Sequence, residues 1–134
     1  MVKKFILPLL AIIILCGCGN EKAQENALLD SVKNVHDRIT GEDYAMLKTR
    51  MKIKKLVIRK PGLKDSADYY LKKMDENDSL MTKWINKFNP DLTGKTHEQA
   101  MSYLSIQKKE VMHIELLEIQ GFHDAVHFCI RNIR

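Results

Sequence analysis

The chain has 134 residues, of which 45% are hydrophobic, and 22 lysines and arginines face 17 aspartates and glutamates. This length accommodates one domain, and the composition is that of a globular protein rather than a disordered or fibrous one. We expect residues 26–134 to form this domain, because the pattern of the first 25 residues is different.

The N-terminus has the pattern of an export signal. "MVKK" supplies a positive n-region, and "FILPLLAIIIL" is an apolar h-region that is too short for a comfortable transmembrane helix and contains Pro8. Residues 1–17 are therefore predicted to be a cleaved signal peptide. Their removal leaves 20 basic and 17 acidic side chains, and this balance does not argue for a nucleic-acid partner.

The end of this segment, "LCGC", has Leu15 three residues before Cys18 and Gly17 directly before it. It resembles the lipobox of bacterial lipoproteins, which implies cleavage before Cys18 and a diacylglyceryl group on its thiol. Cys16 fits less well, because the bulky Leu15 would then occupy the cleavage position. The alternative is an ordinary signal peptide followed by an unmodified cysteine. A covalent lipid is the only cofactor expected, and two or three acyl chains anchor a protein durably.

After the anchor, residues 18–25 are expected to form a polar lipidated tether. Gly19 follows Cys18 where an aspartate signals inner-membrane retention in some bacteria, so the outer membrane is favoured over the inner membrane. With Cys18 acylated, Cys129 in "VHFCIRNI" is the cysteine that remains, and we expect it to be a buried small hydrophobe rather than a reactive thiol.

The first helix is predicted from about residue 26 to Ile58, with a kink or short break near Gly41, because glycine disfavours a helix interior. "MKIKKLVI" also alternates like a strand, but no partner strand is evident. The apolar residues follow helical spacing, with Glu42 and Thr49 as polar exceptions on the same stripe: Leu28, Val32, Val35, Ile39, Met46, Ile53 and Leu56.

"RKPGLKDS" ends this helix, and Asp65 or Ser66 is expected to cap a second one that runs to about Phe88. Its stripe contains Ala67, Tyr70, Met74, Asn77, Met81, Trp84 and Phe88. Thr96 and Gln99 match a capping box that starts a third helix, which continues to near the C-terminus. Three amphipathic helices joined by turns predict an all-α fold, an antiparallel three-helix bundle with long helices.

The segments "LLDSVKNVHDRI", "SADYYLKKMDENDSLMTKWINKFNP" and "EQAMSYLSIQKKEV" are similar to a group of small bacterial lipoproteins, many of which carry the label "viral A-type inclusion protein". The match spans most of residues 26–115 and is most specific at Met81, Trp84 and Phe88. The C-terminal "EIQGFHDAVHFCIRNIR" and Gly41 depart from the group. The resemblance implies a helical bundle on a lipid anchor and supplies no activity.

"HDAVH" is the candidate metal site. His123 and His127 are four residues apart, so both imidazoles project from one helix face and could share zinc or copper. Asp124 replaces the glutamate that zinc proteases use, and no third ligand is evident by spacing. Two exposed histidines without a metal are the simpler interpretation.

His36 with Asp37 is a second candidate site, although a hydrogen bond from His36 to a neighbouring helix explains the pair better than catalysis does. His97 and His113 are expected at the surface.

The run "KTRMKIKKLVIRK" contains seven cations and no acid. It predicts ion pairs with the acidic second helix as the default. The alternative is an interaction face, which could also contact anionic lipid headgroups or envelope polysaccharide, formed by Lys52, Lys54, Lys55, Arg59 and Lys60. The aromatic residues around Trp84 could line a ligand groove, but packing in the core is the favoured interpretation. No nucleophile and base can be paired, so we expect no enzyme but a structural or protein-interaction role at the envelope, with metal binding as the alternative.

Overall fold

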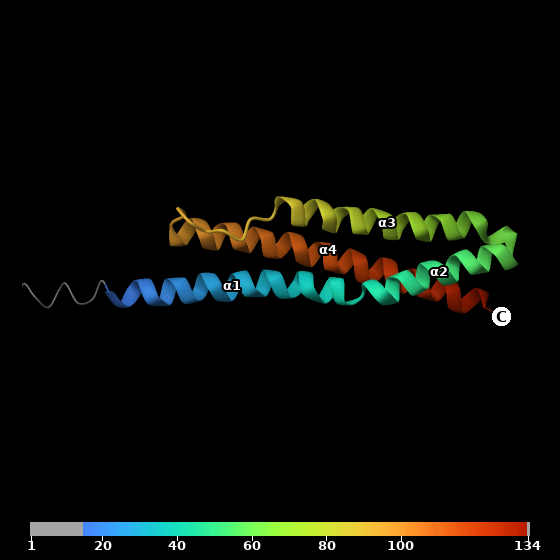
Figure 1. Cartoon of the computed structure of the whole chain (residues 1–134), viewed down its shortest axis with the longest axis horizontal. Helices are drawn as coiled ribbons and strands as arrows, with labels where there is room; N and C mark the ends of the chain where they lie inside the picture. Colours follow the sequence, from blue (N-terminus) through green and yellow to red (C-terminus); the bar gives the residue numbers. More distant parts are fainter. Residues whose placement is uncertain (1–14, 134) are drawn as a thin grey trace, which may run out of the picture.

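The computed structural model describes residues 15–133, whose path is shown in Figure 1. The elements are α1 (Leu15–Gly41), α2 (Asp43–Arg59), a 3-10 turn η1 (Pro61–Leu63), α3 (Lys64–Lys87) and α4 (His97–Asn132). Residues 15–133 contain no strand, so the expected all-α class is confirmed. Most of the predicted signal peptide and the side chain of Cys18 lie outside what is described.

The predicted first helix is two helices, and the break lies at Glu42. The amide of Glu42 donates to the carbonyl of Ile39 at 3.0 Å, which closes a tight turn directly after Gly41. α2 then starts without a side-chain cap. α1 and α2 continue in nearly the same direction (Figure 1). The break expected near Gly41 is therefore found, and "MKIKKLVI" is helical.

Residues 18–25 are helical, because α1 already begins at Leu15. Glu25 is buried, and its two carboxylate oxygens lie 3.0 Å from Nδ1 of His97 and 3.2 Å from Nζ of Lys22. Hydrogen bonds from His97 and then Lys22 lower the pKa of Glu25. The first turns of α1 are thus held against the start of α4.

The start of α3 also differs from expectation. The backbone carbonyl of Lys60 accepts a hydrogen bond from the amide of Leu63 at 2.9 Å, and the η1 turn runs directly into the helix. α3 therefore begins at Lys64 without a side-chain cap. Asp65 and Ser66 lie inside the helix, so the prediction that one of them caps it is wrong.

The start of α4 is as predicted. The amide of Gln99 donates to the Thr96 hydroxyl at 3.2 Å, and the amide of Thr96 donates to the Gln99 side chain at 3.0 Å. Gly94 has a φ of 80°, a conformation that glycine adopts without strain, and it completes the loop before the cap. The capping box thus fixes the point where the chain reverses into a helix of 36 residues.

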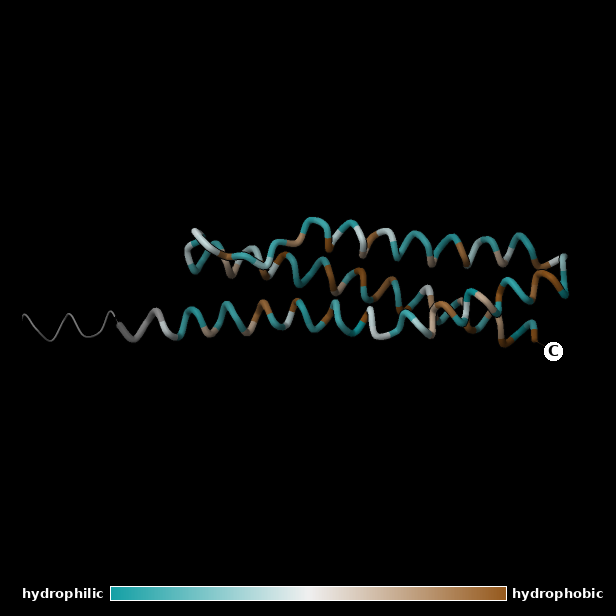
Figure 2. The backbone as a smooth tube through the Cα atoms, viewed as in Figure 1, coloured by the Kyte–Doolittle hydropathy of each residue, from teal (hydrophilic) through white to brown (hydrophobic). Residues whose placement is uncertain are grey.

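The chain runs one way through α1 and α2, returns in α3 and runs in the first direction again in α4 (Figure 1). α4 contacts each of the other three α-helices. Apolar residues recur about once per turn along the helices (Figure 2). Their buried members form three successive clusters, represented by Leu92, Ala100 and Leu104; by Val32, Trp84 and Val111; and by Ile53, Met74 and Phe128.

Trp84 fills the space between α1 and α3, which have no Cα pair within 8 Å in the described chain. Its indole is 5% exposed, and its ring centroid lies 4.9 Å from that of Phe88 and 6.2 Å from that of His36. The stripe residues of the predicted second helix are therefore core, as the spacing indicated, rather than an aromatic groove.

Asn77 and Gly121 explain how α3 approaches α4. The buried Asn77 amide donates to the Leu117 carbonyl at 2.8 Å. A Cβ at position 121 would lie 2.8 Å from Asn77 Nδ2. Gly121 thus interrupts the apolar face of α4 because the Asn77 side chain occupies the space that a Cβ would need.

This close approach predicts that the effect of Gly121→Ala on the free energy of unfolding changes sign when Asn77 is replaced. Gly121→Ala should lower the free energy of unfolding by about 1 kcal/mol, because displacing the buried Asn77 amide costs more than the roughly 1 kcal/mol that alanine contributes to a helix. In the Asn77→Ala background the same change should raise stability by about 1 kcal/mol. Chemical denaturation of the four proteins measures both values.

The matched control is Gly41→Ala, because a Cβ there meets no atom within 4 Å. Its effect should be the same in both backgrounds. If Gly121→Ala also had the same effect with and without Asn77, the steric account of this glycine would be wrong.

Candidate functional site

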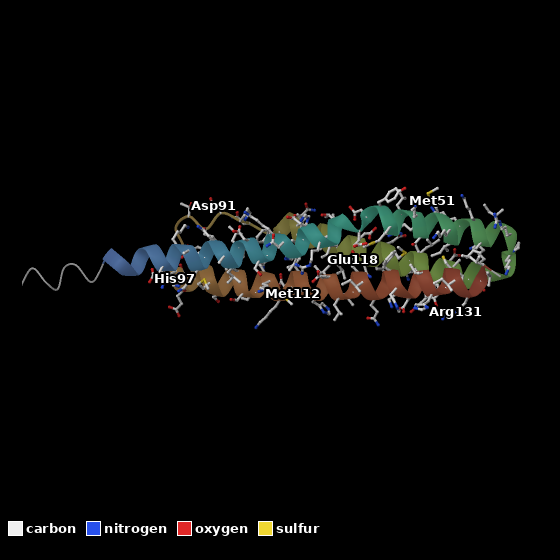
Figure 3. The ribbon with its side chains drawn as sticks, turned by 90° about the horizontal axis from the view of Figure 1, so that it is seen from below. Met51, Asp91, His97, Met112, Glu118 and Arg131 are labelled. Carbon is white, nitrogen blue, oxygen red and sulfur yellow. The ribbon has the colours of Figure 1, made fainter. Side chains whose placement is uncertain are left out.

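α2 turns a second apolar stripe to solvent. Tyr44, Leu47, Met51 and Ile58 are 69%, 55%, 51% and 80% exposed, respectively, and their spacings of three, four and seven place them on one helix face. The buried residues of α2 lie on the other face. Figure 3 shows Met51 at the outer edge of α2. The packing of α2 against α3 and α4 therefore leaves an apolar surface uncovered.

Cations border this stripe. Lys48, Lys52, Lys55 and Arg59 follow at spacings of four, three and four on one side, and Lys54 lies on the other. Lys52, Lys54, Lys55 and Arg59 are exposed and form no ion pair or hydrogen bond within residues 15–133. We call these four side chains, together with the exposed stripe, the outer face of α2.

Arg50 and Lys60, in contrast, form contacts with other helices of the bundle. Arg50 bonds Asp78 at 2.7 Å and also pairs with Asp75, which is the expected contact between the basic run and the acidic helix. Lys60 Nζ donates to the carbonyl of Asn132 at 2.9 Å and so connects the end of α2 to the end of α4. The predicted pairing thus holds for Arg50, while Lys60 belongs to a contact between helix ends.

His123 and His127 lie together on the exposed side of α4. Their Nε2 atoms are 3.0 Å apart, and their ring centroids are 4.3 Å apart at 65°. They border a cavity of about 340 Å³ with Asp124 and Arg131. This geometry permits either one imidazole–imidazole hydrogen bond or a shared metal ion.

The described residues supply no clear third metal ligand beside His123 and His127. Asp124 already lies 3.3 Å from Nζ of Lys73, and the cationic Arg131 borders the same cavity. Within residues 15–133, no three histidine, cysteine, aspartate or glutamate side chains are grouped so that they could hold a metal ion. The pair can therefore provide two ligands, and water or another chain would have to complete the coordination.

The other histidines are distributed differently from expectation. His36 Nδ1 lies 3.3 Å from Asp37 on its own helix, so its contact with the neighbouring helix is the Trp84 ring and not the expected hydrogen bond. His113 is exposed, as expected. His97 is not a free surface residue, because it contacts Glu25 across α1 and α4.

Cys129 is 3% exposed, and burial raises the pKa of its thiol. Because the thiolate is the reactive form, this environment makes the thiol inert. The expectation of a buried small hydrophobe is confirmed.

Glu118 is the chemically unusual group that sequence reasoning treated only as an interruption of the apolar face. It is 4% exposed and has no hydrogen bond or ion pair to any residue from 15 to 133. Burial, followed by the negative charge of Asp78, raises its pKa to about 7, whereas Arg50 opposes the shift and Asp43 adds to it. A charged residue at a core position was the signal in the sequence, but its lack of a partner was not visible there.

Three regions of the described chain therefore carry chemistry that the packing does not use: the outer face of α2, the His123–His127 pair and Glu118. None of the helices in residues 15–133 is long and apolar enough to cross a bilayer. No known family model, curated protein or solved structure matches this chain.

Proposed function

We propose that this chain is a lipid-anchored protein of the bacterial cell envelope with a non-catalytic structural or protein-interaction role. In this proposal residues 1–17 are a signal peptide, acyl chains on Cys18 hold the protein in the membrane, and the outer membrane is favoured. The mature part is an antiparallel bundle in which α1 with α2, α3 and α4 are the three rods.

The observation that carries the interaction role is the outer face of α2. Its apolar stripe is bordered by lysines and an arginine that no acid of the described chain neutralises. Contiguous exposed apolar residues rimmed by polar ones mark interaction surfaces. An envelope protein that presents an acidic rim around an apolar patch would complement both features.

The anchor is supported by the order of residues at the start of the chain. "LCGC" follows an apolar segment of export length and places Cys18 where the lipobox requires it. α1 begins at Leu15, so an acyl group on Cys18 would join a helix rather than a flexible segment.

The anchor predicts two forms that differ in mass and in fractionation. Intact-mass analysis of the membrane fraction should find a chain that begins at Cys18 and carries acyl groups. The Cys18→Ala variant should lack them and leave the membrane fraction, and Cys16→Ala is the matched control that should be processed normally. An unmodified wild-type chain would contradict the anchor.

The interaction surface is tested by site-specific photo-crosslinking in cells. With p-benzoylphenylalanine at Met51, we expect a discrete crosslinked protein that is absent when the probe replaces Met112, an exposed methionine on α4 (Figure 3). The triple change Lys52→Glu, Lys55→Glu and Arg59→Glu should reduce this product at least tenfold, since like charges across an interface repel.

The control for charge alone is Lys33→Glu, Lys83→Glu and Lys109→Glu, which reverses three exposed lysines on α1, α3 and α4. It should leave the crosslink intact. Equal crosslinking from positions 51 and 112, or equal loss in both triple variants, would remove the outer face of α2 from the proposal.

A metal-binding envelope lipoprotein is the second candidate, favoured by the 3.0 Å separation of the His123 and His127 Nε2 atoms. It predicts that zinc or copper raises the thermal unfolding midpoint and that His127→Ala abolishes this rise, because one imidazole alone binds a metal weakly. His113→Ala, at an exposed histidine on the same helix, is the control. An unfolding midpoint that neither metal changes would eliminate this candidate.

A further inference from the structure

Glu118 lies where α4 passes the break between α1 and α2, near the middle of the molecule (Figure 3). Most of this side chain is buried and it has no hydrogen bond or ion pair in the described chain, so its ionised form is costly, because no donor replaces the water that burial removes. Such a group in a packed helix is expected either to be neutral or to have a partner that is absent from the chain itself.

A cavity of about 420 Å³ adjoins this carboxyl group. Its apolar walls are Ile39, Met46, Ile119 and Phe122, which come from α1, α2 and α4. This volume lies within the range of about 300–1,000 Å³ that small-molecule sites occupy. The cavity thus combines apolar walls with the carboxyl group of Glu118, which forms no hydrogen bond or ion pair in the described chain.

The charges around Glu118 leave an excess of acid. Arg38 also lines the cavity, but it is occupied by Glu115 through bonds of 2.8 and 3.0 Å, and this pairing raises the pKa of Arg38. Glu42 lines the cavity as well and forms no ion pair in the described chain. Glu118 and Glu42 therefore face the cavity as uncompensated acids.

A second cavity beside Glu118 shows the same excess of acidic over free basic side chains. Glu118 lines this cavity of about 460 Å³ together with Asp43, Arg50 and Asp78. Arg50 is already shared between Asp75 and Asp78, which leaves Asp43 without an ion pair among residues 15–133. The groups facing Glu118 from α1, α2 and α3 thus have no free cation to offer.

An inorganic cation fits this place poorly, because hard metal ions take six or more oxygen ligands and most of the lining is apolar. An anion is disfavoured by the excess of acid. We propose that the cavity beside Glu118 binds a small organic cation, with an ammonium group on the Glu118 carboxylate and an apolar body against Ile39, Met46, Ile119 and Phe122. This inference rests on neither the lipid anchor nor the outer face of α2.

Three probes of one shape test the proposal: phenethylammonium, 2-phenylethanol and phenylacetate. Each is titrated by calorimetry into the intact protein as it is purified, in nanodiscs if it is acylated and in buffer if it is not, and the heat from the matching blank is subtracted. Phenethylammonium should bind at least tenfold more tightly than the neutral and anionic probes. Glu118→Gln should reduce its affinity at least tenfold, and Glu110→Gln, at an exposed position two turns earlier in α4, should not change it.

The dependence on pH is a second readout. Glu118 is ionised only above its pKa of about 7, while phenethylammonium stays protonated. If the ionised carboxylate is the binding form, apparent affinity should rise about tenfold between pH 6 and pH 8. Glu118→Gln should remove this dependence.

The wild-type protein alone can overturn the proposal. Equal affinity for phenethylammonium and 2-phenylethanol would show that the cavity takes apolar bodies without recognising charge. No heat above the blank, or unchanged affinity in Glu118→Gln with a native circular dichroism spectrum, would also contradict the site.

Discussion

The burial of one face of α4 is the constraint on which the other helices depend. α4 contacts α1, α2 and α3, whereas the backbones of α1 and α3 do not come within 8 Å of each other in the described chain. α1 and α3 are therefore positioned by their contacts with α4 and by side chains between them such as Trp84. Since burial of a large apolar side chain contributes about 1.5–3 kcal/mol, these shared clusters stabilise the arrangement more than the surface ion pairs do.

The elements that follow from local chemistry were predictable. Thr96 with Gln99 forms the expected capping box, and the expected break near Gly41 lies at Glu42, because both depend on residues a few positions apart. The cap of α3 was not predictable in the same way. Asp65 and Ser66 are good caps in isolation, but the η1 turn already continues into the helix before either is reached.

The candidate sites were less predictable than the helix ends, because they depend on partners that are distant in the sequence. The contact between Glu25 and His97, 72 residues later, was not predictable, because no local pattern reveals it. The spacing of His123 and His127 did place both rings on one face. Glu118 was visible as a polar residue on an apolar stripe, but its isolation depends on Arg50 being occupied by α3 and Arg38 being occupied by Glu115.

Because α1 and α2 follow a nearly straight path, they hold residue 18 and the end of α2 far apart. Residues 18 and 59 are separated along these helices by about 60 Å at 1.5 Å per residue. Because α1 starts at Leu15 and Glu25 is held against α4, little slack separates Cys18 from the rod. For a chain acylated at Cys18, the tilt of the rod rather than the extension of a linker would decide what the outer face of α2 meets: headgroups if the rod lies flat, and a layer tens of ångströms away if it stands upright.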